Sequence, residues 1–480
     1  MKKKNFFLIR KTQMAKSLLA FCLCFFLVGI TSCIKGYDED NQYTSGVTNT
    51  TLVSPNADGI TFLKSPDGTS VKIEWPVVFG AGGYEVSFYI ADDPENLELV
   101  GEENEIVDGC FIIRPLLEDT KYQFVVKALG NERYNNKTAE TATLREMSTL
   151  VEATMIPDGT DLSDFFANNP IVDNGEEIAY ELAAGGNYTI SSRIDLGRAY
   201  LTLRGDKVNR PTVVAGAGFR SLGGGNKFKF INFECEGMTG NAFYGFDDID
   251  NSGAVEEVNG TNRTVIVRNP IMFQECNFAK LPQPLLFDDN KPYAVSTFIV
   301  DNCVVELTNN GRFYRNQAGY GALKDFTISN STVYKTNTGG DQWMQLGGQG
   351  LDRFGWASGS QTYINNTFYG FNHMHNSNNY SRTQAPVTVT VKNNLFLDFV
   401  AGDGDPVARR ILPGGNRNNK TVIFDTNTYW KNGAAEPDHA NDPSGTALKE
   451  DPGCQDPANG NFKVTNANTI AAGIGDPRWW

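Results

Sequence analysis

Histidine and cysteine are scarce in this 480-residue chain, and both absences bear on metal chemistry. There are three histidines, of which His373 and His375 form a pair with no obvious third ligand. No two cysteines have the Cys-x-x-Cys spacing of a zinc site. The sequence therefore gives no reason to expect a zinc centre.

The cysteines are also too few and too spread out to form a disulfide scaffold. Three of the eight lie within the first 33 residues, and the remaining five form an odd set. Three of these five, Cys235, Cys276 and Cys303, occupy similar places in neighbouring repeats, described below. We expect them to form a stacked row of buried thiols.

Basic residues are fewer than acidic residues in this chain. The chain has 42 basic and 56 acidic residues, a net charge of −14. Residues 1–32 hold six of the basic residues and no acidic one, so the remainder carries 36 minus 56, or −20. Such a charge disfavours binding to nucleic acid and to anionic lipid surfaces. A polyanionic ligand would need a local basic pocket or a bridging metal.

One long hydrophobic run is present, from Leu18 to Ile30, and it follows a cluster of basic residues. This order is that of an export signal, and the run is short for a membrane-spanning helix. It ends in Ile30-Thr31-Ser32-Cys33, which resembles a bacterial lipobox. The resemblance implies that residues 1–32 are a lipoprotein signal peptide and that Cys33 is the lipidated first residue of the mature chain.

An acidic and polar tether, residues 33–51, follows Cys33. Its Lys35 and the acidic run 38–40 resemble the surface-export signal of Bacteroidetes lipoproteins. This resemblance implies a chain anchored in the outer membrane and facing outward from the cell.

Short alternating strands are expected from residue 52 to residue 149. Val71-Lys-Ile-Glu-Trp75 and the turn Leu116-Leu-Glu-Asp-Thr-Lys-Tyr122 make this segment similar to a fibronectin type III domain. The resemblance implies that Trp75 is a core residue and Tyr122 the residue of a tyrosine corner. A spacer role is the default expectation for this domain.

A short sequence motif then recurs between about residue 230 and residue 430. Each copy is a pair of apolar residues, a small polar corner and further apolar residues in period-two alternation, without the three- and four-residue spacing of helices. The copies are 26 to 44 residues apart. Their corners are marked by Asn232, Cys276, Asn302, Asn330, Asn366, Asn394 and Asn427. A strand that returns each turn without room for a crossover helix predicts an all-β chain ending in a right-handed parallel β-helix, residues 155–480.

The first expected coils contain two sequence motifs that resemble those of pectin-lyase-like β-helices, Leu201-Thr-Leu-Arg-Gly205 and Pro211-Thr-Val-Val214. The segment Asp161–Phe166 is a candidate helix to cap the open end of the solenoid. The end of the chain, from Asp451 to Trp479, resembles the C-terminal β-helix domains of Bacteroidetes surface proteins from polysaccharide-utilisation loci. This resemblance implies polysaccharide as the partner class and an outer-membrane glycan importer as a further candidate partner.

A polysaccharide lyase is one functional hypothesis. β-Elimination on a uronic acid needs a neutraliser for the carboxylate, often Ca²⁺, and a base to take the proton. Candidate metal ligands are Asp288, Asp289 and Asp301, and candidate bases are Lys291, Arg312 and Arg315. The alternative is that these are solvated loop corners paired with one another. The Trp-Ile-Asp-His stretch of pectate lyases is absent from the sequence.

Aromatic residues between the repeats support a second hypothesis, glycan binding. Exposed rings stack on sugar faces, and polar side chains read the hydroxyl groups. The candidates lie in the long insertions and are Tyr320, Trp343, Trp356, Tyr380 and Arg382. The alternative is that these rings pack loops onto the solenoid. We expect a surface lipoprotein that captures a complex polysaccharide, with a lyase, a glycoside hydrolase or an adhesin as alternatives.

Overall fold

The computed structural model divides into two compact units, residues 1–150 and 151–480. The described residues are 47–249, 255–258, 262–308, 312–316, 321–336, 343–346, 350–376, 385–399, 407, 420–435 and 442–480. The signal, residues 1–32, and residues 33–46 of the tether, including Cys33, lie outside these residues. Each unit is described by itself.

The first unit is a sandwich of two antiparallel sheets. One sheet has the order β1 (Thr61–Lys64), β2 (Ser70–Glu74), β6 (Phe111–Pro115). The other has the order β4 (Glu98–Leu99), β3 (Gly83–Ile90), β7 (Lys121–Leu129), β8 (Thr143–Ser148), with β5 (Glu105–Val107) beside β3. Two short 3₁₀ turns, η1 (Ala57–Gly59) and η2 (Glu132–Tyr134), lie in its connections. The alternating burial along β2 and β7 places every second side chain in the shared core.

The two aromatic residues singled out from the sequence of this unit are core residues. Trp75 is buried and packs with its ring centroid 5.3 Å from that of Phe124. The buried Tyr122 accepts a hydrogen bond at its hydroxyl from the backbone N–H of Leu117, five residues upstream. This contact is the bond expected of a tyrosine corner, because it ties the entering chain to the strand.

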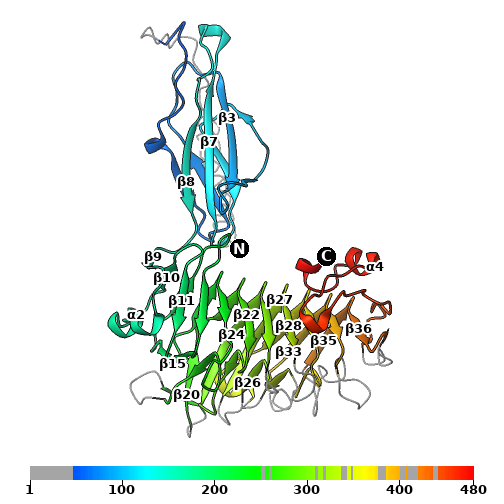
Figure 1. The fold of residues 1–480 in the computed structure, drawn as a ribbon. Coiled ribbons are helices and arrows are strands. Elements are labelled where there is room, and N and C mark those ends of the chain that lie inside the picture. The colour runs from blue at the N-terminus through cyan, green and yellow to red at the C-terminus, as the bar shows by residue number, and fades with distance from the viewer. Residues whose placement is uncertain are drawn as a thin grey trace, which may run out of the picture. The chain divides into compact units, whose positions relative to one another are not determined.

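The second unit is a parallel β-helix, and the expected all-β fold is confirmed (Figure 1). Each coil contributes strands in turn to a first, a second and a third sheet, and parallel connections of this kind wind to the right. The first sheet contains β9 (Ala153–Ile156), β10 (Ile178–Leu182), β13 (Leu201–Arg204), β16 (Asn226–Lys229), β21 (Ile271–Gln274), β24 (Tyr293–Asp301), β27 (Ala322–Ser329), β30 (Gly359–Ile364), β33 (Val387–Lys392) and β35 (Lys420–Asp425), joined by the hairpin β19 (Val255–Val258) and β20 (Asn262–Val267).

The other two sheets follow the same order along the axis. The second contains β11 (Asn187–Ile190), β14 (Thr212–Ala215), β17 (Asn232–Glu234), β22 (Asn277–Leu281), β25 (Val304–Leu307), β28 (Thr332–Lys335), β31 (Thr367–Tyr369), β34 (Leu395–Leu397), β36 (Thr428–Lys431) and β37 (Ala434–Ala435). The third contains β12 (Ile194–Asp195), β15 (Phe219–Ser221), β18 (Tyr244–Phe246), β23 (Leu286–Phe287), β26 (Tyr314–Asn316), β29 (Met344–Leu346) and β32 (His375–Asn376). Inward side chains of all three sheets form one continuous apolar core.

The N-terminal end of the solenoid is covered by helix α2 (Leu162–Asn168). Asp161 caps it by accepting a hydrogen bond from the N–H of Ser163, and Leu162 and Phe166 are buried against the first coil. The predicted capping helix at this position is therefore confirmed.

The turn from the first sheet to the second explains the repeating polar corners. From β16 onward it has two residues in each coil, and the first has a positive φ near 50 to 60°. These first residues are Phe230, Glu275, Asn302, Asn330, Asn365, Asn393 and Thr426. Asparagine suits the position because it tolerates the left-handed conformation better than most side chains.

The second turn residue points inward and builds a ladder along the axis. The N–H of Ser331 donates to Oδ1 of Asn366 at 3.1 Å, that of Asn366 to Oδ1 of Asn394 at 3.1 Å, and that of Asn394 to Oδ1 of Asn427 at 3.0 Å. Cys303 continues the ladder by donating its N–H to Oγ of Ser331 at 3.0 Å. Each buried N–H thus finds a partner one coil further on.

This ladder corrects three details of the sequence prediction. Asn302 and Asn330 are the left-handed turn residues, and the ladder positions beside them are Cys303 and Ser331. Cys276 and Cys303 are stacked, with the N–H of Cys276 3.4 Å from Sγ of Cys303. Cys235 is buried but follows β17 instead of preceding it, so it is not part of that row.

The end of the chain does not continue the coil; it folds back over the outer face of the second sheet. Phe462, Val464 and Ile474 bury against Tyr369 and Leu395 of that face. Three short helical turns shape this C-terminal segment, residues 450–480: η5 (Pro457–Asn459), α4 (Ala467–Ala471) and η6 (Pro477–Trp479).

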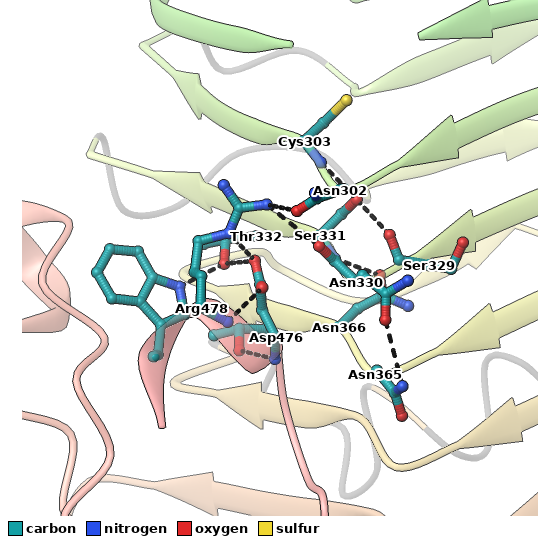
Figure 2. A network of polar contacts seen from close by, with 12 residues as sticks. Asn302, Cys303, Ser329, Asn330, Ser331, Thr332, Asn365, Asn366, Asp476 and Arg478 are labelled. Carbon is teal, nitrogen blue, oxygen red and sulfur yellow. Dashed lines mark hydrogen bonds and ion pairs between the residues drawn. The ribbon is translucent and has the colours of Figure 1, made fainter. Parts of the chain in front are cut away.

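Polar contacts then fix the last residues across several coils (Figure 2). Asp476 accepts from Oγ1 of Thr332 at 2.7 Å and from Nε of Arg478 at 2.7 Å. Arg478 donates onward to Oδ1 of Asn302 at 2.6 Å, and the indole of Trp479 donates to Oγ1 of Thr332 at 2.7 Å. The segment therefore covers the second sheet and joins adjacent coils that are far from it in sequence.

Candidate functional site

The variable loops of the β-helix flank the third sheet. Turns from the first to the second sheet have two residues from β16 onward, so they contribute no variation to the repeat spacing. The connections into and out of the third sheet differ from coil to coil: four residues separate β22 from β23, and six separate β25 from β26. Because the loops of a solenoid are where function is usually placed, the outer face of the third sheet is the candidate site.

The strand register aligns a row of outward residues on this face. The row runs along the axis at the spacing of stacked strands, roughly 4.8 Å per coil. Its described members are Asp195, Arg220, Gly245, Phe287, Arg315 and Gln345. We call this set the outer row. It offers guanidinium and amide donors together with carboxylate and carbonyl acceptors.

Arg220 is the most buried charged member of the outer row. Its Nη1 donates to the backbone carbonyls of Phe219 at 2.8 Å and Ala242 at 3.3 Å, which fixes the guanidinium in place. Burial lowers the pKa of Arg220, and the nearby carboxylate of Asp289 acts in the opposite direction. Gly245 lies over this group, because a Cβ there would stand 3.1 Å from Nη1 of Arg220 and 3.1 Å from the carbonyl oxygen of Phe287. The guanidinium of Arg220 and the carbonyl of Phe287 therefore fill the space that a side chain at residue 245 would take.

Ion pairs surround the outer row at its N-terminal end. Arg193 contacts Asp195 at 2.8 Å and Asp247 at 3.3 Å, and these side chains are at least one-third exposed. Such exposed pairs contribute little to stability, so their groups can exchange partners with a ligand at low cost. Asn241 donates to Oδ1 of Asp289 at 3.2 Å on the same side.

The three candidate bases of the lyase hypothesis lie in different surroundings. Lys291 forms an ion pair with Asp248, and the hydrogen bond between them raises the pKa of the lysine. Arg315 belongs to the outer row, and its guanidinium lies 4.7 Å from the centre of the Phe287 ring in the coil below. Arg312 precedes β26 and is half-buried. The backbone carbonyl of Arg315 accepts from the backbone N–H of Asp288 at 3.1 Å, so the two residues lie in adjacent coils.

The three predicted metal ligands do not come together. Asp288 is buried at the start of the turn that precedes β24, and Asp289 follows it at a positive φ. Asp301 lies at the other end of β24, roughly 25 Å along the strand. It accepts hydrogen bonds from Ser329 at 2.7 Å and from Asn330 at 3.1 Å. The predicted grouping with Asp301 is therefore wrong, and no cluster of three metal-binding side chains is found within the described residues.

The prediction of an exposed ring at Trp343 is also wrong. Trp343 has no exposed surface and stacks on Phe313 of the preceding coil, with ring centroids 4.5 Å apart. It belongs to a buried row at the entry to the third sheet, together with Phe243, Leu285, Phe313 and Met374. The glycine-rich residues around Trp343 suggested an exposed loop, but the apolar pair Trp343-Met344 repeats the pair Phe313-Tyr314.

Of the other four predicted glycan-binding residues, the structure describes Trp356. Trp356 is half-buried beside Phe354, with ring centroids 5.2 Å apart, at the corner between the third and first sheets. Tyr320, Tyr380 and Arg382 lie outside the described residues. The sequence analysis did not identify Asp195, Arg220 and Gln345. Asp195 and Gln345 each stand between two apolar residues, a pattern that marks an outward position, whereas Arg220 stands between Phe219 and Ser221.

No helix within the described part of the chain is both long and apolar enough to cross a bilayer.

Three family models match this chain, each along one segment. Residues 1–185 match a domain of unknown function, DUF4992, residues 186–336 match DUF4957, and residues 361–479 match DUF5123, both also domains of unknown function. No curated protein matches the chain.

Among solved structures, the chain is similar to pectate lyase PelI from Erwinia chrysanthemi in complex with tetragalacturonic acid. The identity is 9%, and the match covers 78% of this chain and 100% of the other, with a TM-score of 0.18. Because this TM-score is low, the similarity carries no argument about the fold, and the parallel β-helix is shown by the strand pairing itself.

Proposed function

We propose that this chain is a surface lipoprotein whose β-helix captures a complex polysaccharide along the outer row of the third sheet, without cleaving it. The observation that carries the proposal is the placement of the variable loops, which flank this sheet. The outer row supports it, because its charged and amide side chains offer hydrogen-bond donors and acceptors in coils stacked roughly 4.8 Å apart, which suits a polyhydroxylated chain laid along the axis.

The arrangement favours capture over elimination. A lyase needs a base that is deprotonated at the working pH, whereas Lys291 is paired with Asp248 and its pKa is raised by that bond. Arg315 lies over an aromatic ring. A lyase, a glycoside hydrolase and an adhesin are the outcomes that the experiment below separates from capture.

For the first unit we propose a fibronectin type III domain that acts as a spacer. Its two sheets and the Tyr122 contact support this assignment. The lipobox ending at Cys33 supports anchoring in the outer membrane, with the β-helix facing outward and a glycan importer as a partner.

The proposal is tested with residues 45–480, which include both compact units. The protein is run in native gels containing neutral or acidic polysaccharides, with and without Ca²⁺, and ultraviolet absorbance and reducing ends are followed in parallel. We expect retardation by at least one polysaccharide with no change in its chain length. Unsaturated uronate product would establish a lyase, new reducing ends alone a hydrolase, and absence of retardation across the panel would contradict glycan capture.

A further inference from the structure

A cavity of about 260 Å³ lies at the corner where the first coils pass from the third sheet to the first. Its wall comes from three successive coils: Arg198 and Tyr200 between β12 and β13, Gly223 and Gly224 between β15 and β16, and Arg268 after β20. Insertions also occur at this corner. The cavity is thus part of the flank of the candidate site, yet no residue of it belongs to the outer row.

Close backbone packing creates the hollow. A Cβ at Gly224 would stand 2.1 Å from the carbonyl oxygen of Ala199, and Gly223 has a φ of 102°, so neither position accepts a side chain. Asn269 braces the wall by donating from Nδ2 to the carbonyl of Gly224 at 2.9 Å. The floor of the cavity is therefore fixed backbone and not a loose gap between side chains.

The lining is cationic in a strongly acidic chain. Arg198, Arg268 and Asp173 are the charged residues of the lining, so arginine outnumbers carboxylate, whereas the whole chain has a net charge of −14. Behind Tyr200, Nζ of Lys227 lies 4.9 Å from the ring centre and is held by Glu177 at 3.0 Å. Burial raises the pKa of Tyr200, whose hydroxyl is hydrogen-bonded to Lys227 and Glu177.

The volume limits the ligand. At about 260 Å³ the cavity is smaller than the roughly 300–1,000 Å³ of a drug-sized pocket. It therefore suits one substituent or one sugar unit of a longer chain. Guanidinium groups bind carboxylate and sulfate oxygens through paired N–H donors.

We propose that this cavity, through Arg198 and Arg268, binds the acid group of one sugar unit, so that the captured polysaccharide is acidic. The inference rests on the proposed function and narrows it. Carboxylate and sulfate share this chemistry, and the experiment distinguishes them.

The test uses residues 45–480 in affinity gels containing polygalacturonate, dextran sulfate or neutral dextran. The double variant Arg198→Ala/Arg268→Ala is compared with Arg133→Ala/Arg145→Ala, which makes the same charge change on the first unit. We expect retardation by polygalacturonate or by dextran sulfate, which identifies the acid group, and at least a tenfold weaker apparent affinity in the cavity variant alone. Circular dichroism melts establish that both variants are folded, and Arg198→Lys/Arg268→Lys, which keeps the charge, replaces the alanine variant if it is not.

Each other result has a defined meaning. Retardation by neutral dextran alone overturns the acidic inference and leaves glycan capture standing. Equal loss in both double variants, or no loss in either, overturns the role of the cavity. No retardation by any glycan in this set or in the wider panel contradicts both the inference and the proposed function.

Discussion

At the residue scale, the inner ladder of the two-residue turns is where single side chains matter most. Asn394 accepts the N–H of Asn366 and donates from Nδ2 to the carbonyls of Tyr363 and Lys392 at 2.9 and 3.0 Å. It is fully buried, so water cannot replace these bonds. A short side chain at this position leaves several backbone groups without partners.

We expect Asn394→Ala to lower the free energy of unfolding by about 2 to 4 kcal/mol, since each unsatisfied buried group costs about 1 to 3 kcal/mol. The matched control is Ser331→Cys, because cysteine already occupies the ladder at Cys276 and Cys303. That control should change stability by less than about 1 kcal/mol. Chemical denaturation measures both, and equal effects would contradict the ladder.

Trp343 provides the second residue-scale prediction. Because its ring is fully buried against Phe313, Trp343→Ala should cost about 3 to 5 kcal/mol of unfolding free energy. Trp356→Ala, at a half-buried ring, should cost less. Thermal melts compare the two, and glycan affinity per folded molecule should be unchanged in Trp343→Ala. Full stability with lost affinity would restore Trp343 as a binding ring.

At the element scale, the sequence predicted the strands better than their surroundings. Period-two alternation identified the first and second sheets because, from β16 onward, a two-residue turn joins a strand of each into one longer segment, as in residues 387–397. The third-sheet strands have two or three residues, too few for a pattern, so Trp343 appeared to be a loop residue and Arg220 was missed. The marker asparagines were one position off in three coils: Asn302 and Asn330 are the first turn residues of their coils, and Asn232 is the first residue of β17.

The C-terminal segment was not predicted in its observed place. Its contacts with the second sheet join residues up to 176 positions apart, as between Arg478 and Asn302, and no local pattern encodes such a distance. Local sequence also failed to predict the distance between Asp288 and Asp301. The two residues are near in sequence, but they lie at opposite ends of the extended strand β24.

Asp476 makes this segment sensitive to pH. Burial raises the pKa of its carboxyl above the ordinary value of 3.8, with the charge of Arg478 offsetting part of the effect. The folded state therefore holds the proton more tightly than the unfolded state. The resulting stability is full below the ordinary pKa and is lost as the pH rises through the raised value.

We expect Asp476→Asn to flatten that part of the stability profile. Relative to wild type, the variant should gain stability as the pH rises from below about 4 towards 7, since it has no proton to lose. Urea denaturation across this range measures the slope, with Asp451→Asn, an exposed carboxyl of the same segment, as the control. Parallel slopes in wild type and Asp476→Asn would contradict the assignment.

At the scale of the whole molecule, the acidic charge, the lipobox-like sequence and the β-helix are all consistent with the proposed surface lipoprotein. A lipid at Cys33 would hold the chain at the membrane, while the strongly acidic remainder stays off anionic surfaces. In the proposed function, the first unit is a spacer and the third sheet of the β-helix is the surface that binds the polymer.

The anchoring prediction concerns the full chain in its cell. Cys33→Ser should abolish lipid labelling and move the protein from the membrane fraction to the soluble fraction, because the remaining leader no longer supplies a lipid. Protease added to intact cells should digest the wild-type protein. Unchanged fractionation of Cys33→Ser would contradict the anchor, and protection from protease would contradict the outward orientation.

The central claim is that the outer row of the third sheet binds polysaccharide. The most direct measurement is the affinity of Arg315→Ala/Gln345→Ala for the glycan that retards the wild type, beside Lys392→Ala on the first sheet, whose side chain is 47% exposed. We predict at least a tenfold loss, about 1.4 kcal/mol, for the outer-row variant and none for Lys392→Ala. Equal affinity of all three proteins would contradict the claim and move the binding surface away from the third sheet.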